Sequence, residues 1–332
     1  MKHHLTGAVV LAAMAPLAVQ AEGKIYGQFN ISANEVDGVY SNLAGDIENN
    51  QDGQSADNNG SRLGFQGENG QFFYAVELGL SVDDEANGLG TTRHAFVGFN
   101  SSVGTFTFGR TNTAYKLAAQ RLDPFYDTSA VNYKGVAQNE GASYGLSRLA
   151  DGWTNNSIAY ISPEIAGLTV NAGVYLQEES DEDHDYAVGV DYRLGDLGVG
   201  VQYLSIGADT ENGVIAGSTN VVDSAIQATV SYDTKLFSVG LSYEMVDLRT
   251  GGERDYGFLS GSFKLNEFTT LAATYGIVDQ GPGEGDAFTV GAFLNLIENF
   301  TFYGLYSKSG LDNAPAAETD VFSLGVKYGF EI

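Results

Sequence analysis

The last eleven residues of the chain alternate between apolar side chains and polar or small ones. The apolar positions are Phe322, Leu324, Val326, Tyr328, Phe330 and Ile332. Successive side chains of an extended strand point to opposite faces, so this segment predicts a strand with one apolar face and one polar face. A length of eleven residues is also about what a tilted strand needs to cross the hydrocarbon core of a membrane.

The same alternation recurs along the chain and predicts sixteen strands in all. They cover residues 25–33, 61–68, 72–80, 92–100, 105–109, 155–161, 168–176, 186–194, 197–204, 225–232, 236–245, 256–263, 268–277, 287–296, 300–306 and 322–332. Short connections such as 69–70 and 195–196 alternate with long ones at 36–60, 110–154, 207–222 and 309–319. This asymmetry is typical of an antiparallel, up-and-down transmembrane β-barrel with its long loops outside the cell. A soluble β-sandwich also alternates, but it leaves the asymmetry of the connections unexplained.

The first residues indicate export from the cytoplasm. Lys2 precedes an apolar stretch over residues 5–17, and small residues end the segment at Ala21. These are the features of a secretory signal peptide, and the stretch is too short for a membrane-spanning helix. We therefore expect a signal peptide over residues 1–21 and a single barrel domain over residues 22–332, located in the outer membrane of a Gram-negative cell.

The composition excludes several classes of protein. The chain has no cysteine, so neither a disulfide framework nor a thiolate metal site is available. It carries 42 acidic against 16 basic residues, whereas nucleic-acid binding requires a basic surface. The acidic residues cluster at 35–57, 83–85, 178–185 and 279–286, within or beside the predicted connections. We expect these to be solvated loops; binding of divalent cations that bridge anionic lipid head groups is a further hypothesis.

The connection over residues 110–154 is the longest of the chain. A barrel of sixteen strands leaves an aqueous lumen, and a connection of this length is usually functional or disordered. This one contains aromatic residues and charges of both signs, which is consistent with a loop folded into the lumen. A loop that stays outside the barrel is the alternative.

Several segments resemble one known family. SRLGFQGE (61–68), TRHAFVGF (92–99) and GTFTFGR (104–110) are similar to the second, fourth and fifth strands of the Gram-negative general diffusion porins. NSIAYISPE (156–164) resembles the sixth strand of that family, and the last residues resemble its assembly signal. The resemblance covers essentially the whole chain after the signal peptide. It implies a homotrimer of sixteen-stranded barrels, each constricted by its third external loop.

The resemblance also implies that basic side chains on the barrel wall face acidic side chains on that loop. Arg62 and Arg93 match the wall arginines of the family. The alternation supports an inward position for Arg62, because an outward Leu63 turns Arg62 to the lumen. An arginine that faces lipid also costs several kcal/mol. Arg110 is the third candidate. It shares its face with apolar Phe108 and points inward only if the strand bends before the loop.

Asp123 and Asp127 are the candidates for the acidic side of the constriction. They flank a proline-stiffened turn, and the alternative is that they only cap turns. One position departs from the family pattern: Asn155 stands where a basic residue is common. Arg121 and Arg148 are possible substitutes for the missing cation.

These features predict a pore for passive passage of ions and small hydrophilic solutes, with a preference for cations because charged rings select ions by sign. A substrate-specific channel for a sugar or an anion is the alternative, and an adhesin or structural barrel is a third class. We expect no enzymatic activity, no cofactor and no metal. Beyond residue 21 the only histidines are His94, which the alternation places on the lipid side, and His184 in an acidic loop. Expected partners are outer-membrane lipid, lipopolysaccharide and, through the last strand, the barrel-assembly machinery.

Overall fold

The computed structural model describes residues 22–41, 47–50, 53–83, 89–132, 143–150, 153–177, 183–207, 222–249, 251–279, 284–312 and 318–332. The predicted signal peptide, residues 1–21, lies outside the described residues. Among the described residues, no helix is long and apolar enough to cross a membrane.

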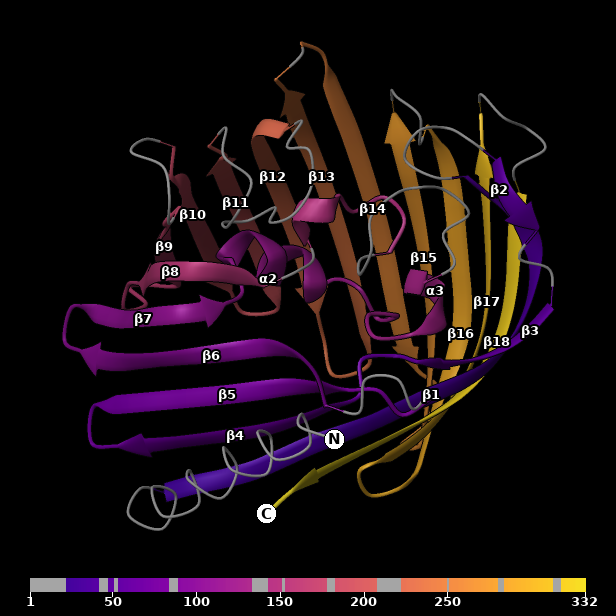
Figure 1. Ribbon diagram of the computed structural model, residues 1–332, viewed down its shortest axis with the longest axis horizontal. Coiled ribbons are helices and arrows are strands. Elements are labelled where there is room, and N and C mark those ends of the chain that lie inside the picture. Colours follow the sequence, from indigo (N-terminus) through magenta and orange to yellow (C-terminus); the bar gives the residue numbers. More distant parts are fainter. Residues whose placement is uncertain are drawn as a thin grey trace, which may run out of the picture.

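The described chain is built from strands that pair antiparallel with their neighbours in sequence and close into a barrel (Figure 1). The strands are β1 (Glu22–Ser41), β2 (Ile47–Asn50), β3 (Gly53–Asn58), β4 (Arg62–Asn69), β5 (Phe72–Leu80), β6 (Leu89–Ser101), β7 (Gly104–Thr111), β8 (Thr154–Ile161), β9 (Leu168–Tyr175), β10 (Asp185–Leu194), β11 (Leu197–Ser205), β12 (Val222–Asp233), β13 (Phe237–Leu248), β14 (Glu253–Lys264), β15 (Thr269–Asp279), β16 (Gly285–Ile297), β17 (Phe300–Leu311) and β18 (Glu318–Glu331). Pairing of β18 with β1, from Tyr26 opposite Glu331 to Gly38 opposite Thr319, closes the barrel. A closed barrel has no sheet edge whose backbone N–H and C=O groups would lie unpaired in lipid.

The eighteen segments form sixteen spans of the barrel, because β2, β3 and β4 all pair with the long strand β1 and act as one interrupted partner. The predicted sixteen-stranded antiparallel barrel is confirmed. The predicted long connection over residues 36–60 is wrong in its extent, since most of it is strand. The exposed side chains at the end of β1, such as Glu35 and Asp37, are acidic, so this stretch does not face lipid and lacks the apolar alternation of a membrane-spanning strand.

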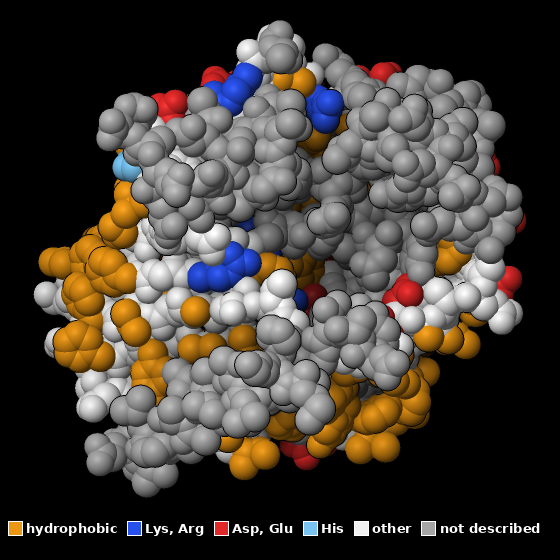
Figure 2. Space-filling model, viewed as in Figure 1, with side chains coloured by type: hydrophobic (Ala, Val, Ile, Leu, Met, Phe, Trp, Pro, Cys, Tyr) orange, Lys and Arg blue, Asp and Glu red, His pale blue; other side chains and the backbone are white. Residues whose placement is uncertain are grey.

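Outward and inward faces alternate as the sequence predicts for the last strand. Leu324 is 57% exposed on the outer face, whereas its neighbour Ser323 on the inner face is fully buried. Figure 2 shows hydrophobic side chains gathered on the left flank of the barrel, over β5 to β7. The wall differs in height around the barrel: β7, β8 and β9 have 8 residues each, whereas β13, β14 and β17 have 12.

The segment between β7 and β8 carries the short helices α2 (Ala114–Gln120) and α3 (Ser129–Asn132) and the 3-10 turn η1 (Arg148–Ala150). Figure 1 shows α2 and α3 inside the ring of strands. Helix α2 packs against β10, β11 and β12, and α3 packs against β17. The hydrophobic clusters of the described chain lie where this segment meets the inner wall; one joins Leu122 and Leu146 to Phe258 of β14. The segment therefore supplies the apolar core that a water-filled barrel lacks.

Candidate pore constriction

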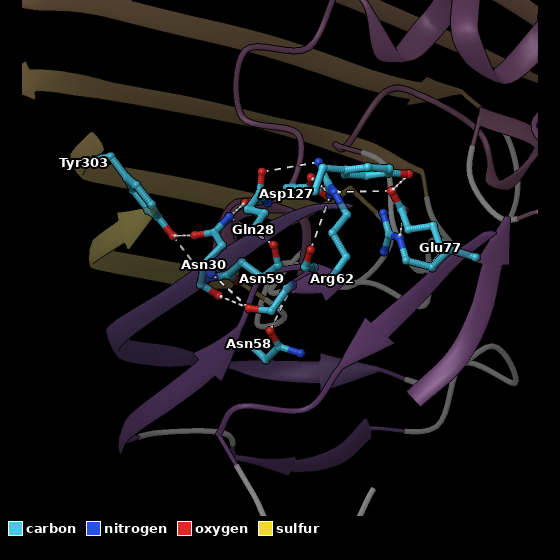
Figure 3. A network of polar contacts seen from close by, with 12 residues as sticks. Gln28, Asn30, Asn58, Asn59, Arg62, Glu77, Asp127 and Tyr303 are labelled. Atoms are coloured by element: carbon cyan, nitrogen blue, oxygen red, sulfur yellow. Dashed lines mark hydrogen bonds and ion pairs between the residues drawn. The ribbon is translucent and has the colours of Figure 1, made fainter. Parts of the chain in front are cut away.

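Arg62, at the start of β4, reaches from the wall to the inner loop. Its Nη1 lies 2.7 Å from Oδ2 of Asp127, which follows α2 in the loop. The same guanidinium donates to Gln28 Oε1 at 3.3 Å, and its Nε lies 3.8 Å from Oε2 of Glu77. Figure 3 shows Arg62 between Asp127 and Glu77. Wall and loop thus meet here in a direct ion pair.

Glu77 of β5 is an acidic wall residue that the sequence prediction does not assign to the site. Its side chain is 8% exposed, and its two oxygens accept hydrogen bonds from Arg93 Nε at 2.7 Å and from the Tyr26 hydroxyl at 3.0 Å. Glu77 therefore lies within ion-pair distance of both wall arginines. The alternation of β5 turns Glu77 away from lipid, so the sequence contains a signal for its inward position.

Arg93 reaches the interior through an irregularity in β6. The pairing of β5 with β6 shifts at Arg93, so that Glu77 opposes His94 while Leu78 opposes Thr92. Opposed residues of an antiparallel pair share a face, so His94 lies on the same face as Glu77. The predicted lipid-side position of His94 is therefore wrong, because a bulge of one residue exchanges the inward and outward faces of the strand at that point.

Trp153, the single tryptophan of the chain, stacks with two cations beside this cluster. The guanidinium carbon of Arg93 and the Nζ of Lys116 in α2 each lie 4.3 Å from the centroid of its ring. The ring face carries negative potential, so these contacts stabilise both cations close together. Trp153 and Lys116 thereby join the loop to the β6 wall.

Asp127 is held in place by its backbone. It has a φ of 59°, in the left-handed region that aspartate tolerates better than most residues. Its carbonyl oxygen accepts a hydrogen bond of 2.6 Å from Asn30 Nδ2 of β1. Asn30 Oδ1 in turn accepts from the Tyr303 hydroxyl at 3.0 Å, as Figure 3 shows. This network of neutral groups fixes the loop turn and aims the Asp127 carboxylate at Arg62.

Asp123 has a different environment from Asp127. It is buried, and its Oδ1 accepts the backbone N–H of Phe125 at 2.9 Å. This is the geometry of a turn-capping aspartate. The structure therefore brings Asp127, but not Asp123, into an ion pair with the wall arginines.

Arg110 lies where β7 bends into the loop. The pairing with β8 shifts between Gly109 and Thr111, and Gly109 has a φ of 124°. The guanidinium donates to the Thr92 carbonyl at 2.7 Å, to the Trp153 carbonyl at 3.2 Å, and to Asn155 Oδ1. Among the residues that the structure describes, no carboxylate lies within ion-pair distance of Arg110. Asn155, where the family commonly has a cation, thus accepts a hydrogen bond from Arg110.

The two possible substitutes for that cation are not part of this cluster as described. Arg121 lies 3.1 Å from Asp191 of β10, on another part of the wall. The side chain of Arg148 lies outside what the structure describes.

His184, the other histidine considered from the sequence, accepts the backbone N–H of Gln177 at 3.3 Å between β9 and β10. No group of three or more histidine or acidic side chains within the described ranges is arranged to hold a metal ion.

Glu244 of β13 fixes the loop on the opposite side. It is 1% exposed and accepts hydrogen bonds from the Tyr115 hydroxyl at 2.5 Å, from the Ser147 backbone N–H at 3.0 Å and from the Ser147 hydroxyl. Burial, together with the charge of Glu244, raises the pKa of Tyr115 well above its ordinary value of 10.0. The phenol therefore stays protonated and remains a donor. We call Tyr115, Ser147 and Glu244 the loop clamp.

Glycines of both the wall and the loop let the loop lie closely against the strands. A Cβ at Gly276 of β15 would overlap the Tyr144 carbonyl, and one at Gly145 would overlap the Gly257 carbonyl. A Cβ at Gly291 of β16 would come within 2.8 Å of the Phe125 ring. Charged residues that form ion pairs can be recognised in the sequence by their charge. A glycine needed for close packing gives no comparable signal in the charge or hydropathy pattern.

A closed sixteen-stranded barrel with an apolar outer face, and with a loop ion-paired to its inner wall, defines a pore of the outer membrane. A family model described as "Gram-negative porin" matches residues 7–330, and the chain belongs to this family. The major outer membrane protein P.IB of Neisseria meningitidis serogroup B is 25% identical over 276 residues, which cover 80% of this chain and 75% of that protein. The protein of the same name from Neisseria sicca is 28% identical over 197 residues, 57% and 52% of the two chains.

Solved porin structures share the fold. The anion-selective porin from Comamonas acidovorans superimposes with a TM-score of 0.67 at 17% identity, covering 93% of this chain and 99% of that one. Salmonella typhi OmpF, in a complex with daunomycin, gives 0.67 at 14% identity, covering 93% and 97%. OmpT of Vibrio cholerae in its trimer form gives 0.65 at 17%, covering 93% and 99%. Membership of the Gram-negative porin family, rather than the shared fold, identifies the protein as an outer-membrane diffusion channel and not an enzyme, as the sequence predicts.

Proposed function

We propose that the protein is a water-filled channel for passive passage of ions and small hydrophilic solutes, narrowed where the loop that carries Asp127 folds against the wall that carries Arg62. The observation that carries this proposal is the 2.7 Å ion pair between Arg62 and Asp127, which holds the loop against the inner wall of the barrel. Arg93 and Arg110 extend the basic wall in this proposal. Asp123 and Asp127 form the acidic side, with Asp127 as the main contributor and Glu77 as an additional acid.

The channel prefers cations under this proposal. Arg62 and Arg93 each lie within ion-pair distance of a carboxylate, so neither presents an unbalanced positive charge to a passing anion. The chain as a whole has a net charge of −26, which makes the potential at the pore mouths negative. Rings of charge select ions by sign. The solved porin described as anion-selective shares only 17% identity, so its preference does not carry over.

We also propose a homotrimer. The strands β7, β8 and β9, with 8 residues each, are shorter than the roughly 9–11 residues that a tilted strand needs to span the hydrocarbon core. Their outer face is apolar, with Phe108 of β7, Ile158 of β8 and Leu168 of β9 exposed. The adjacent β6 continues this apolar face with Val97, which is exposed by 59%. Neighbouring subunits would cover this low wall, and a solved outer membrane protein of Vibrio cholerae with the same fold is described in a trimer form. The tall wall meets lipid and lipopolysaccharide, and the last strand engages the barrel-assembly machinery.

Planar-bilayer recording of the purified protein tests these proposals. We expect insertion steps in threes and a reversal potential, under a tenfold salt gradient, that indicates cation preference. Sugar and neutral-solute flux should be limited by size alone. Net anion selectivity would contradict the proposed preference, and saturable block by micromolar solute would favour the alternative, a substrate-specific channel. Absence of conductance would overturn the channel itself.

A further inference from the structure

Lys327 of β18 is an inward-facing cation that the constriction described above does not use. It pairs in register with Asn30 of β1 and with Thr301 of β17. Asn30 is fully buried on the inner face and contacts the loop, so Lys327 lies on the inner face too. Among the described residues, no carboxylate lies within ion-pair distance of its ammonium group. Lys327 thus differs from Arg62 and Arg93, whose charges are paired.

Lys327 lines a cavity of about 330 Å³ between the loop turn and the inner faces of β14 to β18. Its other polar lining residues include Asp127, Ser262, Thr270, Asn295 and Thr301. A volume of this size, with a few convergent polar groups, is suited to a small solute. The cavity lies beside the constriction and shares Asp127 with it.

The hydrogen bonds of the lining leave donors for a ligand. The Thr301 hydroxyl donates to Asn295 Oδ1 at 2.6 Å, which leaves the Asn295 amide N–H groups as donors. Asn295 and Lys327 lie on either side of Thr301, on β16 and β18. Asp127, the acid in the cavity, already accepts from Arg62. A ligand therefore meets an ammonium and an amide donor, with the nearby negative charge compensated.

We propose that Lys327 and Asn295 form a subsite that binds the carboxylate of a small hydrophilic solute as it passes the constriction. An ammonium and an amide N–H match the acceptor-only oxygens of a carboxylate. The subsite rests on the proposed aqueous channel. Within a channel that prefers cations, the subsite provides a local binding site for organic anions. A uniformly negative passage would have no such site.

Lactate and lactamide test the subsite, because they share a skeleton and differ in charge. Potassium current through single channels of the full-length protein is recorded at constant potassium while either solute is added. We expect lactate, but not lactamide, to reduce the current in a saturable manner. Lys327→Gln should raise the half-reducing lactate concentration about fivefold, consistent with the loss of one charge-assisted hydrogen bond. Lys235→Gln, which removes an exposed lysine from the turn between β12 and β13, should leave it unchanged.

Asn295→Asp provides a second variant that places a negative charge at the other donor, and it should weaken the lactate effect further. Equal effects of lactate and lactamide on the unmodified protein would overturn the subsite without any variant. Equal shifts in the two lysine variants would overturn it as well, because the effect would then be one of general charge. In both cases conductance persists, which separates failure of the subsite from failure of the channel.

Discussion

Arg62 Nη1 and Asp127 Oδ2 lie 2.7 Å apart although the residues are 65 positions apart in the sequence. One belongs to the wall and the other to the loop, so their contact sets the charge balance at the proposed constriction. The arginine is held by Gln28 and Glu77 as well. The aspartate is held by the turn that Asn30 anchors.

Asp127→Asn is expected to move the selectivity of the channel toward anions. The substitution keeps the shape of the side chain and leaves Arg62 with one acidic partner fewer. A unit charge about 4 Å from an ion is worth about 1 kcal/mol in water, so the cation-to-anion permeability ratio should fall about two- to fivefold at low salt. Reversal potentials measure this ratio. Glu253→Gln, at an exposed position of β14, is the control, and an equal shift there would contradict a local origin.

Glu77→Gln is expected to produce a similar shift toward anions, because Glu77 lies within ion-pair distance of both Arg62 and Arg93. The two acids share Arg62, and residues in one network do not act additively. The double variant with Asp127→Asn should therefore shift the permeability ratio by a factor different from the product of the single shifts. Strictly multiplicative factors would mean that the two acids act independently.

Glu244→Ala is expected to release the loop from the wall. It leaves the Tyr115 hydroxyl and the Ser147 groups without their acceptor in a buried place, at a cost of about 2–3 kcal/mol. The barrel strands keep their pairing, so the change should be confined to the loop. Trp153 fluorescence and protease cleavage within residues 112–153 report on it. Glu253→Ala offers a matched exposed control; unchanged protection in Glu244→Ala would show that the clamp is dispensable.

Gly276→Ala is expected to displace the loop by steric overlap alone. The added methyl group would collide with the Tyr144 carbonyl, whereas at Gly261 of β14 the nearest atom, the Ser238 carbonyl oxygen, lies 3.8 Å away. Single-channel current should therefore become noisier or change in size for Gly276→Ala, while Gly261→Ala behaves as the unmodified channel. Identical traces from the two variants would argue against a tight seat at Gly276.

Val97→Trp is expected to weaken the proposed trimer. Val97 lies on the outer face of β6, beside the low wall, so a large side chain there would push neighbouring subunits apart, whereas lipid accommodates tryptophan. Leu241→Trp is the matched control on the tall wall, where Leu241 is 51% exposed. The measurement is the trimer fraction in mild detergent. Equal loss of trimer in both variants, or in neither, would count against subunit contact at β6.

Much of the fold can be predicted from the sequence, because side chains that face lipid must be apolar and those that face the lumen need not be. Alternation predicts the last strand with its outward and inward faces, and the parity that turns Arg62 inward agrees with its position. The rule fails beyond the membrane, which is why the pattern predicts a loop over residues 36–60 although most of them form strands. It also fails at Arg93, where a one-residue shift in pairing exchanges the faces.

The site is less accessible to sequence reasoning. Arg62 and Asp127 are both candidates from the sequence, but nothing in it places one against the other across 65 positions. Glu77 has inward parity, yet parity does not say which inward acid meets an arginine. Glu244 and Gly276 escape prediction because their importance depends on how closely the loop approaches strands far along the chain.

The loop clamp also bears on the order in which the molecule is built. Glu244 follows Tyr115 by 129 positions and Ser147 by 97. The loop is therefore synthesised well before the strands that hold it, and contacts of such long separation are slow to form. Until β13 to β15 have formed, the loop lacks the wall residues that it contacts. Most strands of the barrel must therefore pair before the loop can narrow the passage. Formation of the constriction thus indicates that the barrel wall is nearly assembled.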